Sequence, residues 1–476
     1  MAKNPQDYRI LDKDLGRIAN AETAAAQAAS GWLRLGAAAL FIAAVVLVVL
    51  GMAGQQGALA TIAAGAAIAA YLALGIGGND VSNALAPAYG ARAISLGAGL
   101  ALAAGAELAG AWLGGQAVTG TLTRGILNID LLLFDRAPAR IMLAALLAAA
   151  IWISLATWSR APVSTTHSIV GGIAGAGIAA QGLAAVEWRM LAQIGLVWVV
   201  SPLVSGLLAG GLLAFLRFRV DRAGDRRRAA AVWLPAMVAV TAGAFALYVG
   251  TLAGQGGAVL ATTAPAVALL GWLWARRTLL RQMALLQPEK SVLKHLLGPP
   301  LVLSAGLMAF AHGANDVANV AAPLTVLLQS AGLRGAAIAT PQWIIGLASL
   351  GVATGIVLFG RRLVQMVGSG ITRLNPVRAL CVTMATAITV IAASALAFPV
   401  STTHIAVGGV FGVGLFREWD DRRRRKTRAA LPDEELHRRH LVRRSYMGAI
   451  VTAWAVTVPI SAGLAGGILL IIRRLV

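Results

Sequence analysis

Apolar runs of about twenty residues recur along this chain, and they constrain its fold more than any other feature. Residues 35–54 and 141–158 are two of them, and each is long enough to cross the roughly 30 Å hydrocarbon core of a bilayer as a helix. Within hydrocarbon, every backbone amide and carbonyl must be hydrogen-bonded inside the protein. Only 12% of the residues are charged, about half the usual share of a soluble domain. The sequence therefore predicts an all-α polytopic membrane protein.

The basic residues indicate the topology. The chain carries 40 lysines and arginines and a formal net charge of +21, and most of the basic residues fall in four blocks: 217–228, 276–294, 361–378 and 417–445. All four blocks lie on the cytoplasmic side, as the positive-inside rule requires, if the N-terminus is inside and two segments form hairpins. These hairpins, 141–182 and 379–416, would enter the membrane and return to the same side. The positive charge therefore needs no nucleic-acid partner.

Two motifs occur twice. The pattern GxNDVxN is found at Gly77–Asn83 and again at Gly313–Asn319, 236 residues later, and PVSTTH is found at 162–167 and at 399–404, 237 residues later. We infer an internal duplication. The first GxNDVxN span runs inward and the second outward in the topology above, so the sequence predicts two inverted-topology repeats with broken helices and re-entrant hairpins. Secondary transporters are commonly built in this way.

The GxNDVxN motifs place Asp80 and Asp316 at membrane depth. A carboxylate there costs at least about 2.5–3.5 kcal/mol on insertion scales, which makes it a candidate functional residue. Amide and carboxylate oxygens form the hard ligand set that suits Na+, although the same residues could also cap broken helix ends. Glu107 is a third intramembrane carboxylate, for cation coupling or for a polar contact between helices, with its repeat counterpart expected near Gln342 or Trp343. The predicted cation-binding residues are Asn79, Asn83, Asn315, Asn319, Asp80, Asp316 and Glu107.

The PVSTTH hexapeptides predict helix starts, because proline followed by serine or threonine is typical there. Hydroxyl groups and free amides at a helix N-terminus bind oxyanions, whereas the alternative is a capped hairpin turn. His167 and His404 are proton carriers or packed helix residues, and Arg160, present in one repeat only, adds positive charge or snorkels. The predicted residues for binding an oxyanion such as phosphate or sulfate are Ser164, Thr165, Thr166, Ser401, Thr402 and Thr403, with Asp80 and Asp316.

These motifs, GGNDVSN, GANDVAN and both copies of PVSTTH, together with Glu107, resemble the inorganic phosphate transporter (PiT) family over about 58–216 and 297–472. The resemblance implies a cation-coupled phosphate symporter with Asn and Asp at broken helices and Ser and Thr at hairpin tips. We therefore expect a secondary transporter that imports phosphate together with H+ or Na+. We do not expect an enzyme, and we expect no cofactor. A sulfate permease of the same family is the alternative, followed by an anion channel.

The expected organisation has five parts, in a multi-pass protein of a plasma membrane of the bacterial inner-membrane type. The sequence leaves open whether the substrate is free phosphate or a metal–phosphate complex, and whether the protein forms a homodimer. The parts are a cytoplasmic N-terminal segment (1–32), an extra first span (33–57), transport repeat 1 (58–216), basic loops with two linking spans (217–296), and transport repeat 2 (297–476) with the basic loop 417–445.

Overall fold

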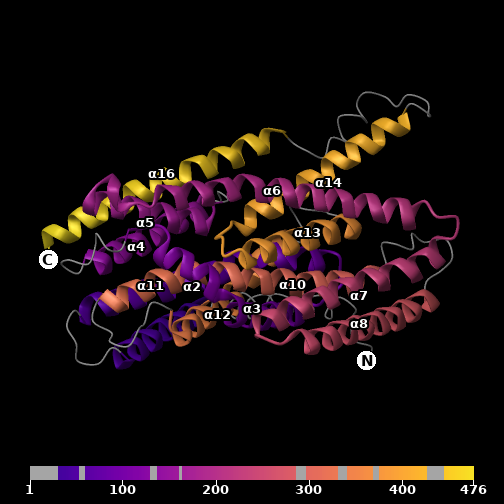
Figure 1. The fold of residues 1–476 in the computed structure, drawn as a ribbon, viewed down its shortest axis with the longest axis horizontal. Coiled ribbons are helices and arrows are strands. Elements are labelled where there is room, and N and C mark those ends of the chain that lie inside the picture. Colours follow the sequence, from indigo (N-terminus) through magenta and orange to yellow (C-terminus); the bar gives the residue numbers. More distant parts are fainter. Residues whose placement is uncertain are drawn as a thin grey trace, which may run out of the picture.

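The computed structural model describes residues 31–52, 59–128, 137–159, 163–285, 296–330, 340–367, 375–425 and 444–475. These residues form a bundle of long helices that run along one common direction, with no β-strand among them (Figure 1). A helix at Gly31–Met52 comes first. The others are α2 (Leu59–Gly90), α3 (Leu96–Arg124), α4 (Ala137–Trp158), α5 (Thr165–Gln181), α6 (Trp188–Leu216), α7 (Arg226–Leu252), α8 (Gly257–Leu285), α10 (Gly298–Asp316), α11 (Ala318–Ser330), α12 (Gln342–Met366), α13 (Pro376–Ala395), α14 (Thr402–Arg425) and α16 (Arg444–Leu475).

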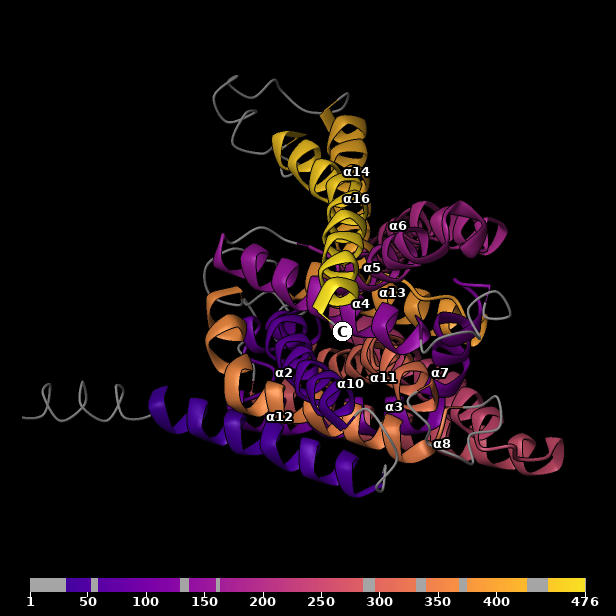
Figure 2. The same ribbon diagram turned by 90° about the vertical axis from the view of Figure 1, so that its left-hand side faces the viewer.

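Eleven helical segments within these ranges are long and apolar enough to cross a membrane. The predicted all-α polytopic fold is confirmed, and the chain is an integral multi-pass membrane protein. The α10–α11 segment, Gly298–Ser330, is the most enclosed of the eleven, with 83% of its most apolar window buried. Figure 2 looks along the bundle and shows α10 and α11 surrounded by the other helices.

The two GxNDVxN motifs lie in different local structures. In the second copy the helix is interrupted as predicted: α10 ends at Asp316, and α11 begins at Ala318. In the first copy α2 continues without interruption from Leu59 to Gly90, so the break predicted there was wrong. The glycine of this copy has another use, because a Cβ on Gly77 would overlap the backbone of Val352 in α12. Gly77 therefore permits close helix packing instead of a break.

Both PVSTTH segments lie at the turns of helical hairpins, as predicted. Helices α4 and α5 pack against each other, and so do α13 and α14. In each pair the second helix begins within the hexapeptide, at Thr165 in α5 and at Thr402 in α14. The hairpin segments are therefore confirmed, with the polar hexapeptides deep inside the bundle.

Close glycine contacts occur in duplicate and reveal the correspondence of the repeats. Gly77 of α2 meets the Val352 carbonyl in α12, and Gly313 of α10 meets the Glu107 carbonyl in α3. Since Gly77 and Gly313 are equivalent, the structural counterpart of Glu107 is Val352, and the expectation near Gln342 was wrong. The chain between the GxNDVxN motif and the following long helix is longer in the second half. The offset between equivalent residues is therefore 245 for α3 and α12, nine more than the 236 that separates the two GxNDVxN motifs.

The second arm of each hairpin also packs through glycine. Gly171 and Gly175 of α5 contact the α16 backbone, and their equivalents Gly408 and Gly412 of α14 contact the α6 backbone. A Cβ at any of these four positions would press on a neighbouring main chain. Each hairpin is thus seated against one long helix, and the same packing is used twice.

Candidate functional site

The serines of the two hexapeptides cap the helices that follow them. Ser164 Oγ accepts a hydrogen bond from the His167 backbone amide at 3.2 Å, and Ser401 Oγ accepts one from the His404 amide at 3.4 Å. Both serines are almost completely buried. A hydroxyl that accepts through its oxygen still has its own hydrogen to donate. Each tip therefore combines a capped turn with a donor facing the interior.

Reciprocal hydrogen bonds join the hairpin tips to the GxNDVxN motifs of the opposite repeats. Asn319 Nδ2 donates to Thr166 Oγ1 at 3.2 Å, and Asn83 Nδ2 donates to Thr403 Oγ1, also at 3.2 Å. Asn83 is the counterpart of Asn319, and Thr166 is the counterpart of Thr403. Thr166 also donates to the carbonyl of Val400 in the other hexapeptide at 3.0 Å. The two tips consequently lie next to each other, in the centre of the bundle.

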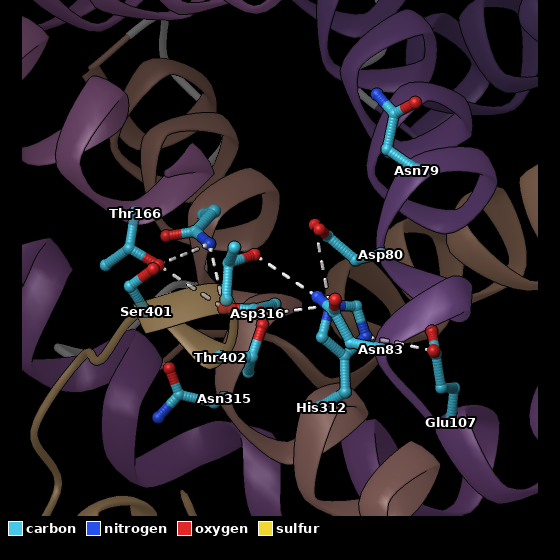
Figure 3. Close-up of polar contacts among 12 residues, drawn as sticks. Asn79, Asp80, Asn83, Glu107, Thr166, His312, Asn315, Asp316, Ser401 and Thr402 are labelled. Atoms are coloured by element: carbon cyan, nitrogen blue, oxygen red, sulfur yellow. Dashed lines mark hydrogen bonds and ion pairs between the residues drawn. The ribbon is translucent and has the colours of Figure 1, made fainter. Parts of the chain in front are cut away.

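Asp316 is the carboxylate that both tips approach. Its Oδ1 lies 3.3 Å from the Thr166 hydroxyl, and its Oδ2 lies 3.3 Å from the Thr402 hydroxyl. The amide of Asn319 is also 3.3 Å from Oδ1. Figure 3 shows Thr166 of α5 and Thr402 of α14 near Asp316. Asp316, at the end of α10, thus connects both halves of the duplicated site.

His312 is the residue of this site that the sequence analysis missed. It lies one helical turn before Asp316, and its Nε2 is 2.7 Å from Asp316 Oδ2. Its Nδ1 is 2.9 Å from Glu107 Oε1, and its Nε2 is 3.7 Å from Asp80 Oδ2. Histidine and aspartate at i and i+4 share one helix face, which is the sequence signal that could have identified the pair.

The two duplicated aspartates differ in their surroundings. The Asp80 side chain is 13% exposed and that of Asp316 only 2%. Within the described residues, the nearest charged partner of Asp80 is His312, and no hairpin hydroxyl donates to it. By the repeat offset, His312 corresponds to Ile76, so the residue that contacts both aspartates has no duplicate. The unduplicated His312 and Glu107 bind each other, and this pair makes the site asymmetric.

The predicted asparagines Asn315 and Asn79 support the hairpins directly. Asn315 Oδ1 accepts from the Val400 amide at 3.0 Å, and its Nδ2 donates to Ser394 Oγ at 2.9 Å. Asn79 Nδ2 donates to Thr157 Oγ1 at 3.3 Å, and Thr157 is the counterpart of Ser394. Both amides hold a hairpin turn in place, so their contacts here are with protein atoms.

The charges of the cluster favour a further cation. An imidazolium at His312 would balance only one of the three carboxylates Asp80, Glu107 and Asp316, and buried carboxylates require compensation by a cation or by protonation. Ligand atoms of Asp80, His312 and Asp316 lie within 4.8 Å of one another. Two buried oxygens, Glu107 Oε2 and Asn319 Oδ1, accept no hydrogen bond in the described structure. Oxygens of these kinds can bind a hard cation or accept protons.

Known proteins resemble this chain in sequence over most of its length. The sequence pattern of the phosphate transporter family matches residues 76–465. The chain belongs to this family. It is 33% identical to a Helicobacter pylori protein named "Putative phosphate permease", over 94% of this chain and 97% of the relative. It is 32% identical to "Inorganic phosphate transporter 2-1, chloroplastic" of Arabidopsis thaliana, over 83% of this chain and 69% of the relative.

A solved structure gives the same fold. The protein described as "The sodium-dependent phosphate transporter" superposes with a TM-score of 0.77 at 28% sequence identity. The superposition covers 88% of this chain and 100% of the other. Membership in a phosphate transporter family therefore rests on sequence and on fold, and both similarities extend over most of the chain.

The transporter's two hexapeptide histidines lie in contact with each other. The ring centroids of His167 and His404 are 4.4 Å apart, and the ring of Trp198 of α6 lies 3.6 Å from that of His167, with both pairs tilted. Trp198 Nε1 also donates to the carbonyl of Pro399 at 2.9 Å. Trp198 therefore contacts both hexapeptides at once. This arrangement corresponds to the packed-residue alternative considered for the histidines.

Two further predicted residues complete the comparison with the sequence. Thr165 is the first residue of α5 and is buried at the same tip as Ser164. Arg160 lies outside the described residues. The structure thus gathers hydroxyls from both tips around Asp316, whereas Asn79 and Asn315 act on the hairpin turns.

Proposed function

We propose that this transporter imports inorganic phosphate by symport with a cation, and that it holds the anion between the two hairpin tips. The observation that carries the proposal is the meeting of both tips at one carboxylate, Asp316. Hydroxyls of Thr166 and Thr402 approach it from the two hexapeptides. The N-termini of α5 and α14 lie at the same place, where helix dipoles and free amides favour an oxyanion. Ser164, Thr165, Ser401 and Thr403 complete the proposed phosphate site.

The carboxylates near this site favour phosphate over sulfate. At neutral pH phosphate carries at least one P–OH group, which can donate a hydrogen bond to Asp316 or Asp80, whereas sulfate carries none. An unprotonated carboxylate beside sulfate would only repel it, and such repulsion is an effective source of specificity. A sulfate permease remains the rival proposal, to be decided by competition.

We propose that the coupling cation binds at the cluster of Asp80, Glu107, His312 and Asp316. Na+ would take its ligands from the carboxylates and from Asn319 Oδ1, and the protein of similar structure is named as sodium-dependent. A proton would instead be taken up by His312 or by a neighbouring carboxylate. In both cases the added positive charge offsets the excess of carboxylates, and it favours an anion beside them.

The proposed architecture has two inverted repeats, 58–216 and 297–476, around this shared site. The duplicated glycine contacts and the reciprocal Asn–Thr hydrogen bonds support the duplication. We further propose that the end of the bundle that carries the basic blocks faces the cytoplasm. Alternating access would then expose the site first to one side and then to the other.

Uptake by purified protein in proteoliposomes tests the proposal. Labelled phosphate is supplied outside while a Na+ gradient and a proton gradient are imposed separately, and sulfate is added as a competitor. Accumulation above the outside concentration under one gradient supports a symporter and names the ion, whereas strict equilibration would identify a channel. Complete inhibition by equimolar sulfate, with labelled sulfate accumulating in turn, would identify a sulfate permease.

A further inference from the structure

Three of the four basic blocks meet at one end of the bundle. Arg217 begins the short π-helical extension of α6, Arg378 lies in the first turn of α13, and Arg417 lies in the last part of α14. Helices α6, α13 and α14 pack against one another, and Figure 1 shows them running to the same end. The positive-inside rule explains why basic residues lie at this end, but it does not explain why three helices gather them at one spot.

Two aspartates neutralise some of these arginines. Asp420 of α14 binds both Arg217 and Arg222, which joins α14 to the end of α6. Burial raises the pKa of Asp420, but the two guanidinium groups outweigh this effect and hold the pKa below its usual value. Asp421 lies 3.7 Å from Arg417 in the same helix. Both carboxylates are therefore engaged with arginines other than Arg378.

Arg378 has no such partner. Its side chain is partly buried, and no hydrogen bond or ion pair joins its guanidinium to another group in the described part of the chain. The positive charges of Arg417 and Arg217 act on the Arg378 guanidinium and repel it. It also lies in the first turn of α13, where the helix dipole is positive. A guanidinium held partly out of water among like charges is unfavourable unless an anion joins it.

We propose that the arginine cluster formed by Arg217, Arg378 and Arg417 binds a phosphate group. The planar fork of arginine matches phosphate oxygens with two parallel hydrogen bonds, and several arginines can share one anion. A phosphate group would supply Arg378 with an anionic partner, which none of the described residues provides, and would screen the repulsion from Arg217 and Arg417. Such a group can come from the headgroup of an anionic lipid or from inorganic phosphate in solution at this end.

Helix α14 connects the arginine cluster to the proposed transport site. Helix α14 begins at Thr402, whose hydroxyl contacts Asp316, and it carries Arg417 fifteen residues later, about 22 Å along the helix axis. The α6–α14 contact is close, because Gly408 and Gly412 lie directly against the α6 backbone. An anion at the cluster therefore acts on the same helix that forms a hairpin tip. The binding site stands independently of the proposed function, whereas this link rests on it.

Calorimetric titration of the full-length protein in a neutral detergent tests the site. The probes are short-chain phosphatidylglycerol and inorganic phosphate, titrated into wild type, Arg378→Gln and Arg378→Lys. Arg281→Gln is the matched control, because Arg281 is exposed near the end of α8 and the substitution removes the same charge. We expect Arg378→Gln to bind a phosphate-group probe at least fivefold more weakly than wild type, Arg378→Lys to lose less, and Arg281→Gln to match wild type.

The possible outcomes distinguish a lipid headgroup from free phosphate, and they distinguish the arginine cluster from the proposed transport site. A loss confined to phosphatidylglycerol identifies a lipid headgroup, and loss of one of two phosphate-binding events identifies free phosphate. Unchanged binding of both probes by Arg378→Gln, or an equal loss in Arg281→Gln, would overturn the proposal. The double variant Ser164→Ala/Ser401→Ala reports on the transport site alone, so failure there leaves the arginine cluster untouched. Thermal unfolding of each ligand-free variant checks that the fold is retained.

Discussion

Individual residues at the hairpin tips have two tasks that substitution can separate. Ser401 caps α14 and, in our proposal, donates its hydroxyl to phosphate, and Ser164 does the same for α5. Alanine removes the cap and the hydroxyl, and loss of a cap costs about 0.5–2 kcal/mol, whereas glycine removes the hydroxyl but costs only a few tenths. We expect Ser401→Gly and Ser401→Ala to raise the KM for phosphate uptake alike, by about tenfold. A near-normal KM in the glycine variant would show that Ser401 only caps α14 and does not bind phosphate.

The two aspartates are expected to be indispensable. Asp316→Asn removes the charge that both tips and His312 approach, and Asp80→Asn removes the second carboxylate beside His312. Each variant should insert into the membrane and lose phosphate uptake, because the cluster then attracts the coupling cation less strongly. Uptake in vesicles, with the amount of inserted protein measured by immunoblot, gives the answer. Glu187→Gln, at an exposed position, is the control that should transport normally. Normal uptake by either aspartate variant would remove that residue from the site.

The sequence pointed to some of these residues and not to others, for a physical reason. Asp316, Thr166 and Thr402 belong to motifs that occur twice, and duplication distinguishes a functional pattern from a single polar residue. His312 and Glu107 have no duplicates, and the distance between α3 and α10 that brings them together is set by glycine contacts between backbones. Tertiary packing of this kind leaves no periodic trace in a sequence, so only part of the pair was recognised.

Helices and hairpins were predicted well where apolar length decided the outcome. The spans and the two hairpins follow from runs of apolar residues interrupted by PVSTTH. The break predicted within α2 was wrong, because glycine near Asp80 serves close packing on α12 and the helical hydrogen bonds continue. Gly313 packs just as closely in the second repeat, yet α10 ends three residues later, at Asp316, so equivalent motifs form a continuous helix in one repeat and an interrupted helix in the other. Which of these occurs depends on the neighbouring helix, which the local sequence does not contain.

The close packing of α14 on α6 gives a prediction for the whole of helix α14. A methyl group at Gly412 would overlap the backbone of Gly206, so Gly412→Ala forces α14 away from α6. Overpacking of this kind typically costs about 1–3 kcal/mol. We expect a lower melting temperature in detergent and slower uptake, since α14 also carries a hairpin tip. Gly211→Ala in α6 is the matched control: its methyl group meets nothing within 4 Å, and a helical glycine-to-alanine change should leave stability equal or higher. Equal melting temperatures for both variants would contradict this close packing.

Across the whole molecule, the asymmetry of the site distinguishes the two repeats. Both hairpin tips are engaged with Asp316, which is buried, whereas Asp80 is partly exposed and contacts His312. Asp80 is therefore the aspartate more open to its surroundings in this conformation. A transporter built from two equivalent halves needs such inequality, because a symmetric arrangement would open to both sides or to neither.

The orientation of the whole bundle is the final prediction. The turn between α6 and α7 belongs to the basic end, and the turn between α7 and α8 lies at the other end. Gly224 and Gly256 lie in these turns, are exposed, and have open space around them, so cysteine fits at both positions. In a Cys381→Ala background, a membrane-impermeant maleimide applied to intact cells should label Gly256→Cys and spare Gly224→Cys until the membrane is permeabilised. The reverse pattern would place the arginine cluster outside the cell, and the phosphate group that it binds would then come from the external side.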